Sequence, residues 1–274
     1  MHTAIATGFL SLEEEVAAEL AGKGVSGLGN AAAVAKVVAL SSAKMAWRYV
    51  PSLPRSLLAS TYAAARYEKD GMRMWVMVKS EVGAWGYAAF GLLAGLLAAW
   101  NTVKGCSRSC RPTSRRPCGG GNVYGIRDLR PVDAPWEELE AMDNSGGPPE
   151  VGFFDVSDEP IYEGFALARG VAEVDGAVDP RRIERVAVEA APRAWEVLPL
   201  VHMNEITYAR AKAAILGGSL ELELETGNRG RTGSAMEAVF GVGVAMIDAS
   251  SSAPQPRIEK IDLASSAKRP LAEG

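Results

Sequence analysis

A run of nineteen residues without a charged side chain, Val82 to Trp100, constrains this chain more than any other feature of its sequence. As an α-helix, the run is roughly 28 Å long, which is close to the hydrocarbon thickness of a bilayer. Trp85, Tyr87 and Trp100 stand near its two ends, where aromatic rings favour the headgroup layer of a membrane. The run therefore predicts a single transmembrane helix.

Small residues recur along this helix at spacings of four, three, four and three, so that they form one stripe. A stripe of this kind lets two helix backbones approach closely, and Gly91-x-x-x-Gly95 is its minimal form. The stripe predicts self-association of the helix into a homo-oligomer. Its members are Ala84, Ala88, Gly91, Gly95 and Ala98.

The same run also fits a fully buried helix in a soluble, Ala-rich protein. Near-continuous apolar runs occur in the cores of large soluble proteins as well as in membranes. Both alternatives remain open from the sequence, since length and hydrophobicity alone do not separate them.

The net charge of −4 is distributed unevenly along the chain. Residues 1–80 carry a net charge of +3, residues 81–122 carry +4, and residues 123–274 carry −11. The acidic last part repels phosphate backbones. Any contact with nucleic acid is therefore expected from the first 122 residues.

The segment that follows the apolar run, residues 104–122, holds two prolines, four glycines and five cations. This composition predicts a solvated linker and a domain boundary. Cations beside a membrane helix attract anionic lipid, and the same cations could instead bind RNA or DNA phosphates. An ordinary flexible loop is the third interpretation. The five cations are Lys104, Arg108, Arg111, Arg115 and Arg116.

We expect an α+β protein with a helical N-terminal part, a long central apolar helix, and a mixed α/β C-terminal domain. The predicted regions are an Ala-rich helical region over 1–80, the apolar helix over 81–103, the basic linker over 104–122, an acidic α+β domain over 123–249, and a flexible tail over 250–274.

Local patterns predict the individual elements. Asn30 can cap a helix from Ala31 to about Tyr49, and Asp179-Pro180 is typical of a helix start. Further helices are expected over 54–69 and 205–216, and a strand over 238–247. The residues from Ser219 to Glu225 alternate strictly between Leu and Glu after the serine, which predicts a strand with one apolar face.

No catalytic, cofactor or metal site is predicted. The three cysteines, Cys106, Cys110 and Cys118, lie in the linker and lack a fourth ligand for zinc, because the histidines are His2 and His202. Neither a Ser–His nor a Cys–His relay has support from the sequence, and no Gly-rich run has the form of a phosphate loop. An enzyme is therefore our third choice of function class, and no small-molecule substrate is identified.

The N-terminus has no Lys or Arg before the short apolar run Ala4 to Leu10, so a cleaved secretory signal is not expected. In a membrane protein, the central helix would act as its own insertion signal. The cations on its two sides favour, by a small margin, a cytosolic C-terminal domain.

Two functions are compatible with these features. The first is a single-pass membrane scaffold or adaptor that self-associates through the stripe of small residues. The second is a soluble, self-assembling structural protein of the cytoplasm or a virion, such as a viral coat or nucleic-acid-coating protein, whose basic linker contacts RNA or DNA. Ala, Ser and Pro make up 79 of the 274 residues. In size and in this bias the chain resembles the Pro/Ala/Ser-rich RNA-coating proteins of polymycoviruses. This resemblance is one of composition and covers no motif, and the acidic balance differs from what RNA coating favours.

Overall fold

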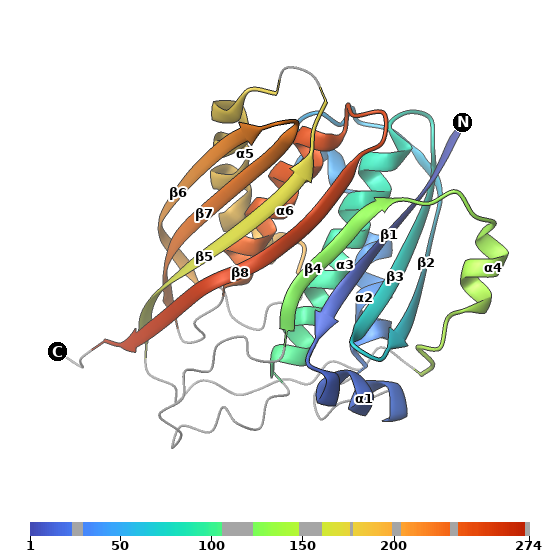
Figure 1. Ribbon diagram of the computed structural model, residues 1–274, viewed down its shortest axis with the longest axis horizontal. Helices are drawn as coiled ribbons and strands as arrows, with labels where there is room; N and C mark the ends of the chain where they lie inside the picture. Colours follow the sequence, from blue (N-terminus) through green and yellow to red (C-terminus); the bar gives the residue numbers. More distant parts are fainter. Residues whose placement is uncertain are drawn as a thin grey trace.

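The computed structural model describes residues 1–23, 30–105, 123–147, 161–175, 178–198, 204–230 and 235–271. Within these residues, eight strands form one antiparallel sheet in the order β2-β3-β1-β4-β8-β5-β7-β6 (Figure 1). The elements of the first half are β1 (His2–Leu12), α1 (Glu14–Lys23), α2 (Ala31–Ala43), the 3₁₀ helix η1 (Ala46–Arg48), β2 (Leu58–Glu68), β3 (Gly71–Ser80), α3 (Ala84–Gly105) and β4 (Val123–Pro131).

A connecting segment that contains α4 (Trp136–Ala141) leads to the second half. The elements of that half are β5 (Tyr162–Glu173), α5 (Pro180–Ala190), the 3₁₀ helix η3 (Ala191–Glu196), β6 (Glu205–Leu216), β7 (Ser219–Gly230), α6 (Met236–Ser250) and β8 (Arg257–Pro270).

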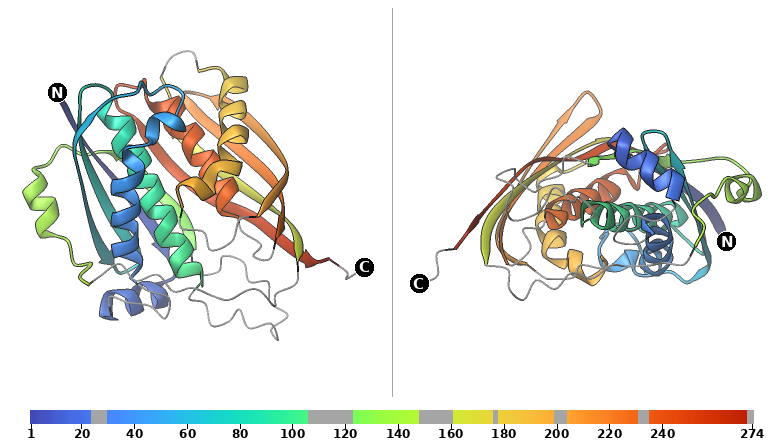
Figure 2. Two further views of the ribbon diagram at one scale, coloured as in Figure 1. Left: turned by 180° about the vertical axis from the view of Figure 1, so that it is seen from behind. Right: turned by 90° about the horizontal axis from the view of Figure 1, so that it is seen from below.

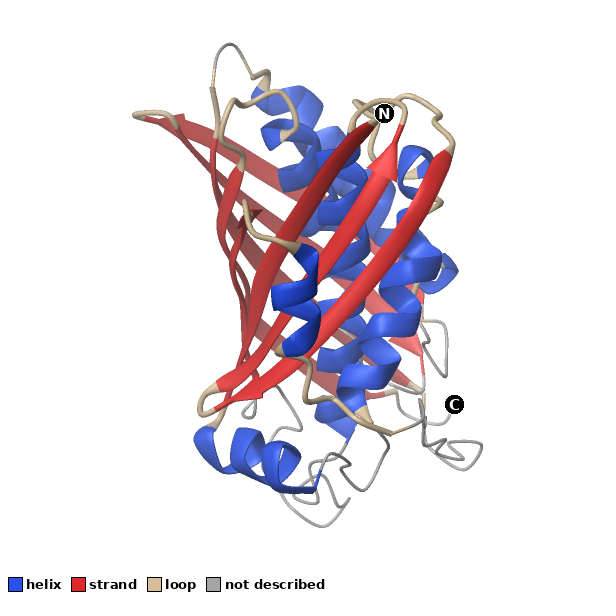
Figure 3. Cartoon of the chain, turned by 90° about the vertical axis from the view of Figure 1, so that its right-hand side faces the viewer, coloured by secondary structure: helices blue, strands red, loops and turns tan. Residues whose placement is uncertain are grey.

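The helices α2, α3, α6 and α5 lie side by side on one face of the sheet (Figure 2). The opposite face, which we call the open face, carries α4 beside β2 and β3 (Figure 3). Trp136 and Leu139 of α4 pack there on Ile5, Trp75 and Met77. The main core therefore lies between the sheet and its four helices, and a smaller cluster lies under α4.

The two halves of the chain have the same topology. In each half, a strand is followed by a helix, a hairpin, a second helix and a closing strand; the first half has the additional helix α1 before α2. The strand order is palindromic about the antiparallel pair β4–β8. A palindromic order with an antiparallel central pair relates the halves by an approximate twofold axis normal to the sheet. The chain is thus built from two copies of one βαββαβ unit.

Short sequence motifs accompany this repeat. Ala4-Ile-Ala-Thr-Gly8 of β1 corresponds to Ala166-Leu-Ala-Arg-Gly170 of β5. Phe90-Gly91 of α3 corresponds to Phe240-Gly241 of α6, and the two phenylalanine rings meet edge to face at 6.1 Å between centroids. The repeat was not predicted from the sequence, although these motifs are its signal.

The predicted fold class is wrong in its division of the chain. The first 80 residues are not a helical region, because they contain β1, β2 and β3. The strands of the C-terminal part do not form a separate domain, because β8 pairs with β4 and continues the same sheet. The predicted flexible tail over 250–274 is also wrong, since β8 lies in the centre of the sheet between β4 and β5.

Alanine explains two of these errors. Residues 54–69 and 205–216 are Ala-rich, and Ala has the highest helix propensity, yet the structure places β2 and β6 there. On the inner face of the sheet, Ala63 and Ala65 of β2 and Ala211 and Ala213 of β6 pack on the core below the helices. Tertiary packing of small side chains therefore overrides local propensity.

Residues 238–247 belong to α6 and not to a strand. The glycines that interrupt this segment are positions of close helix contact. A Cβ atom at Gly241 would lie 2.6 Å from the carbonyl oxygen of Ala187 in α5, and one at Gly243 would lie 2.6 Å from the side chain of Leu93 in α3.

Three local predictions are confirmed. β7 follows the Leu/Glu alternation, with Leu220, Leu222 and Leu224 buried. Asn30 caps α2 by accepting a hydrogen bond from the Ala33 N–H at 3.0 Å. Asp179 caps α5 in the same way, by accepting from the Arg181 N–H at 3.0 Å.

α3 is the central helix of the fold. It is long and apolar enough to cross a membrane, but 89% of its apolar window is buried inside the protein. It packs on α2, on α6 and on the inner face of the sheet. A helix covered on every side is apolar around its whole circumference, so a core position accounts for the same pattern that predicts a membrane span.

Side chains close both edges of the sheet. At the β2 edge, the Ala65 N–H donates to Asp143 at 3.4 Å and the Tyr67 N–H donates to Asn144 at 2.9 Å. At the β6 edge, the N–H of Ala213 donates to Glu184 of α5 at 2.9 Å. Ala65 and Ala213 are equivalent positions of the repeat, so a carboxylate accepts a hydrogen bond at the corresponding point of each edge.

Candidate nucleic-acid interface

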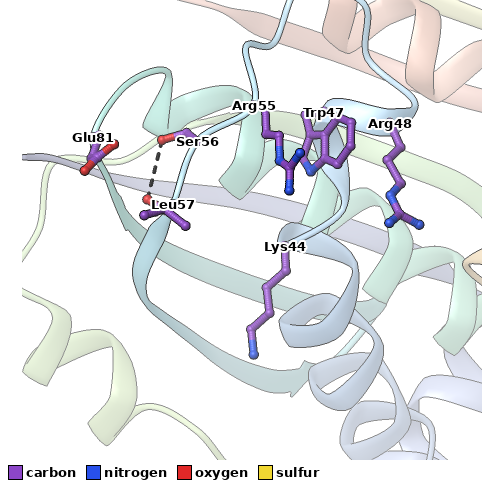
Figure 4. Close-up of a pocket in the computed structure, with 7 residues that line it drawn as sticks. All are labelled: Lys44, Trp47, Arg48, Arg55, Ser56, Leu57 and Glu81. Carbon is purple, nitrogen blue, oxygen red and sulfur yellow. Dashed lines mark hydrogen bonds between the residues drawn. The ribbon is translucent and has the colours of Figure 1, made fainter.

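A cavity of about 460 Å³ opens at the C-terminal end of α2 (Figure 4). We call it the basic groove. The end of α2, η1, the loop before β2 and the end of β3 contribute to it. It is lined by Lys44, Trp47, Arg48, Arg55, Ser56, Leu57 and Glu81.

Trp47 lies between two arginines in this groove (Figure 4). The Cζ atoms of Arg48 and Arg55 lie 5.4 and 5.2 Å from the centre of its ring, within the range of cation–π contacts. The indole is half-buried against the main core, whereas both arginines are exposed. The core thus fixes the ring, and the ring in turn orients the two guanidinium groups.

The charge of the groove is positive. Three cations, Lys44, Arg48 and Arg55, face one acid, Glu81. None of the three cations forms an ion pair with a residue in the described part of the chain. Leu57, which is 76% exposed, adds an apolar surface beside them.

Three arginines of the open face, by contrast, form ion pairs. Arg66 and Arg73 both bind Glu68, at 2.7 and 3.1 Å, and Arg169 binds Glu223 at 2.7 Å. Acidic partners therefore compensate these three arginines, whereas Lys79, Arg210 and Lys212 of the same face form no ion pair with a described residue. The basic groove offers its charge to a ligand, and for this reason we consider it the candidate site.

A cluster of polar contacts joins the groove to the second half of the chain. The Tyr49 hydroxyl donates to Glu196 at 2.9 Å, and Arg193 binds the same carboxylate with two nitrogens at 3.0 Å. The hydrogen bond from Arg193 is the main cause that lowers the pKa of Glu196. Burial, together with the hydrogen bond to Glu196, raises the pKa of Tyr49 to about 12.

The stripe of small residues is buried inside the chain. A Cβ atom at Gly91 would lie 2.8 Å from the Ala39 carbonyl oxygen, and one at Gly95 would lie 2.7 Å from that of Ala35, so both glycines face α2. Ala98 packs on Val34 and Val38 of α2. The remaining members, Ala84 and Ala88, are buried as well. The close approach that the stripe predicts thus occurs between two helices of one chain, and a second copy could reach the stripe only if α2 moved away.

The predicted phosphate-contact residues fall mostly outside the described part. Lys104 belongs to the last turn of α3. Outside the described residues lie Arg108, Arg111, Arg115 and Arg116, together with Cys106, Cys110 and Cys118. His202 lies outside them too. Among the described residues, no group of three or more His, Cys, Asp or Glu side chains could hold a metal ion.

The residues of the basic groove were not predicted from the sequence. A local charge count is the signal that could have found them, because residues 44–55 contain three cations and no acid around Trp47. Only the fold, however, shows that these cations lack acidic partners among the described residues.

Comparisons with known proteins add no function. No family model matches the chain, and no curated protein matches it. Two solved structures show weak similarity. The ferredoxin protease FusC, in complex with Arabidopsis ferredoxin, is 11% identical with a TM-score of 0.22; the match covers 91% of this chain and 34% of that one. An unknown protein from Galdieria sulphuraria is 10% identical with a TM-score of 0.17, over 94% and 99% of the two chains. The chain spans about a third of the length of FusC, and neither likeness is close enough to indicate a shared fold.

Proposed function

We propose that this chain is a nucleic-acid-coating structural protein that binds a single strand at the basic groove. The observation that carries the proposal is a set of three cations, Lys44, Arg48 and Arg55, that form no ion pair with a described residue and surround a tryptophan ring packed on the core. Proteins that bind single strands without strong sequence preference combine cations for the backbone with aromatic rings for the bases.

The small size of the groove favours a single strand over a duplex. We expect an unpaired base and its phosphate to lie beside Trp47 in this cavity of about 460 Å³. In a duplex, the bases are stacked inside and cannot reach such a ring.

As proposed, α3 remains a core helix and the protein acts as a soluble protein. To span a bilayer, α3 would have to leave α2, α6 and the sheet, and this would expose the main core. The linker cations Arg108, Arg111, Arg115 and Arg116, which lie outside the described residues, add a second electrostatic element to the proposal.

Binding of a short fluorescein-labelled oligouridylate, measured by anisotropy over about 50 to 200 mM salt, tests the proposal. The triple variant Lys44→Ala, Arg48→Ala, Arg55→Ala is expected to lower the slope of log K against log salt by about 2, since each phosphate contact on a single strand contributes about 0.7. Its affinity at 0.1 M salt should fall about 10- to 100-fold.

The matched control removes the same charge from the open face, by Arg130→Ala, Arg169→Ala and Arg269→Ala, which are all paired with acids. Its slope should stay within about 0.5 of the wild-type slope. Equal losses in both variants would indicate a non-specific charge effect and refute the groove as the site. Absence of salt-dependent binding by the unmodified protein would refute the function. The variant that replaces the four linker arginines by alanine measures separately how much the linker contributes to the affinity and to the salt slope.

A further inference from the structure

Trp195 of η3 occupies the same place in the second half that Trp47 occupies in the first. Ala46-Trp47-Arg48 follows α2 as a 3₁₀ helix, and Ala194-Trp195-Glu196 follows α5 as part of another. Trp195 is 52% exposed, an unusual state for the largest apolar side chain. The repeat therefore supplies two tryptophans at the ends of corresponding helices.

Three contacts fix the segment of Trp195 to the segment of Trp47. Arg193 donates to the Arg48 carbonyl oxygen at 2.8 Å, and its guanidinium lies 4.4 Å from the centre of the Tyr49 ring. Tyr49 also binds Glu196, as described above. Because Tyr49 stacks on Phe90 at 5.2 Å between centroids and is buried, the support under both tryptophans is part of the core.

The two tryptophans differ in their charged neighbours. Trp47 stands among cations that form no ion pair with a described residue, although, besides the hydrogen bond from Arg193, the charge of Arg48 contributes to the lowered pKa of Glu196. Beside Trp195, the carboxylate of Glu196 neutralises Arg193 through a two-point ion pair. The first position therefore suits a phosphate together with its base, and the second suits the ring of a base alone.

We infer that Trp195 is a second stacking platform, on which the strand bound in the basic groove places a later base after it crosses from the first half of the chain to the second. This inference rests on the proposed function. It adds a second contact between the bound strand and the protein, in the second half of the chain. It assigns phosphate binding to the first half and base stacking without phosphate contact to the second.

The test compares a dinucleotide with an octanucleotide of uridine on three variants. Trp195→Ala should lower the affinity for the octanucleotide about 5- to 100-fold, the usual effect of one lost base stack, and should leave the salt slope and the dinucleotide affinity unchanged. Trp47→Ala should lower the affinity for both ligands. Phe165→Ala, which removes an aromatic ring that is 38% exposed, is the matched control and should change neither.

The conservative variant Trp195→Phe should recover most of the octanucleotide affinity, because it restores a ring. Urea-unfolding midpoints of the Trp195 variants should match the wild-type midpoint, since that side chain is half exposed. Trp47→Ala removes a ring that packs on the core, so its binding is compared under conditions where urea unfolding shows it to be fully folded. If Trp195→Ala binds the octanucleotide as the wild type does, or weakens the dinucleotide equally, the second platform is refuted. The proposed function then still stands on the loss seen in the triple cation variant, whereas failure of the wild type to bind either ligand refutes both.

Discussion

The two halves of the chain make the same close contact between helices. In the first half, Gly91 of α3 meets Ala39 and Ala43 of α2. In the second half, Gly241 of α6 meets Ala187 of α5 and Ala191 just after it. The strand glycines correspond too, since Gly8 faces Leu92 and Leu96 while Gly170 faces Val242 and Met246. The two copies of the unit have therefore kept the contacts between backbones.

Surface charges have not been kept in the same way. The position of the exposed Arg48 in the first half is taken by the exposed Glu196 in the second. Close packing leaves room for glycine or alanine only, whereas an exposed side chain on the same scaffold can change without cost to the fold. A comparison of the halves thus separates residues that serve the fold from residues that are available for binding.

The equivalent glycines provide the largest expected effect. Gly91→Ala and Gly241→Ala should each lower the free energy of unfolding by about 1–3 kcal/mol, because the new Cβ meets a backbone oxygen that cannot move alone. This cost exceeds the gain of about 1 kcal/mol in helix propensity. Urea unfolding followed by circular dichroism measures both variants.

Gly146→Ala is the control for this pair, since a Cβ there meets nothing within 4 Å. It should change stability by less than about 0.5 kcal/mol. If one helix glycine accepts alanine at no cost and the other does not, the two helix pairs are packed differently, and the equivalence of the halves fails at its centre.

The two edge carboxylates should give unequal, smaller effects. Asp143 accepts hydrogen bonds from Lys36 at 2.9 Å and from the Ser145 N–H at 2.8 Å, besides Ala65. Glu184 accepts the single bond from Ala213. We expect Asp143→Asn to cost about 2 kcal/mol at neutral pH and Glu184→Ala about 1 kcal/mol, both measured by urea unfolding.

The pH dependence of the Asp143 effect has a definite sign. Burial alone would raise the pKa of Asp143, but the hydrogen bonds from Ser145 and Lys36 outweigh it, so the pKa lies below its usual value of 3.8. The stabilisation is therefore complete above the unfolded pKa near 3.8 and is lost as the pH falls through the lower folded pKa. The difference between the wild type and Asp143→Asn should close in acid. A difference that stays constant down to acid unfolding would contradict this account.

The sequence predicted the elements whose pattern is local, and it missed the elements whose state depends on pairing with a neighbouring strand. The Leu/Glu alternation of β7 and the caps Asn30 and Asp179 are visible within a few residues, and all three predictions are confirmed. β2 and β6 were predicted as helices from start and stop signals at their ends, and their alanines do not oppose a helix, while their strand state depends on pairing with β3 and β7.

The same reasoning applies to the site. The chain shows that Lys44, Arg48 and Arg55 are close in sequence, but it does not show that they gather around one tryptophan ring and form no ion pair with a described residue. Absence of a partner is a property of the fold. The apolar run of α3 shows a second limit. A helix surrounded by protein and a helix surrounded by lipid require the same composition, so the sequence does not distinguish the two surroundings.

The loss of the Tyr49 hydroxyl is the smallest expected effect, and it tests the contact between the halves. Only one half makes this contact through a hydroxyl at this position, since the second-half counterpart of Tyr49 is Val197. Tyr49→Phe should cost about 1 kcal/mol at neutral pH, through the lost hydrogen bond to Glu196. Since the pKa of Tyr49 is raised from 10.0 to about 12, the folded protein keeps this proton between those values while the unfolded chain releases it. The stabilisation is then complete below pH 10 and decreases as the pH rises through about 12, so the wild type and Tyr49→Phe should converge in that range.

The absorbance difference between the two proteins during alkaline titration reports the same hydroxyl directly. A transition near 10 in that difference would mean that the hydroxyl is solvated, and the link between Trp47 and Trp195 would then rest on Arg193 alone.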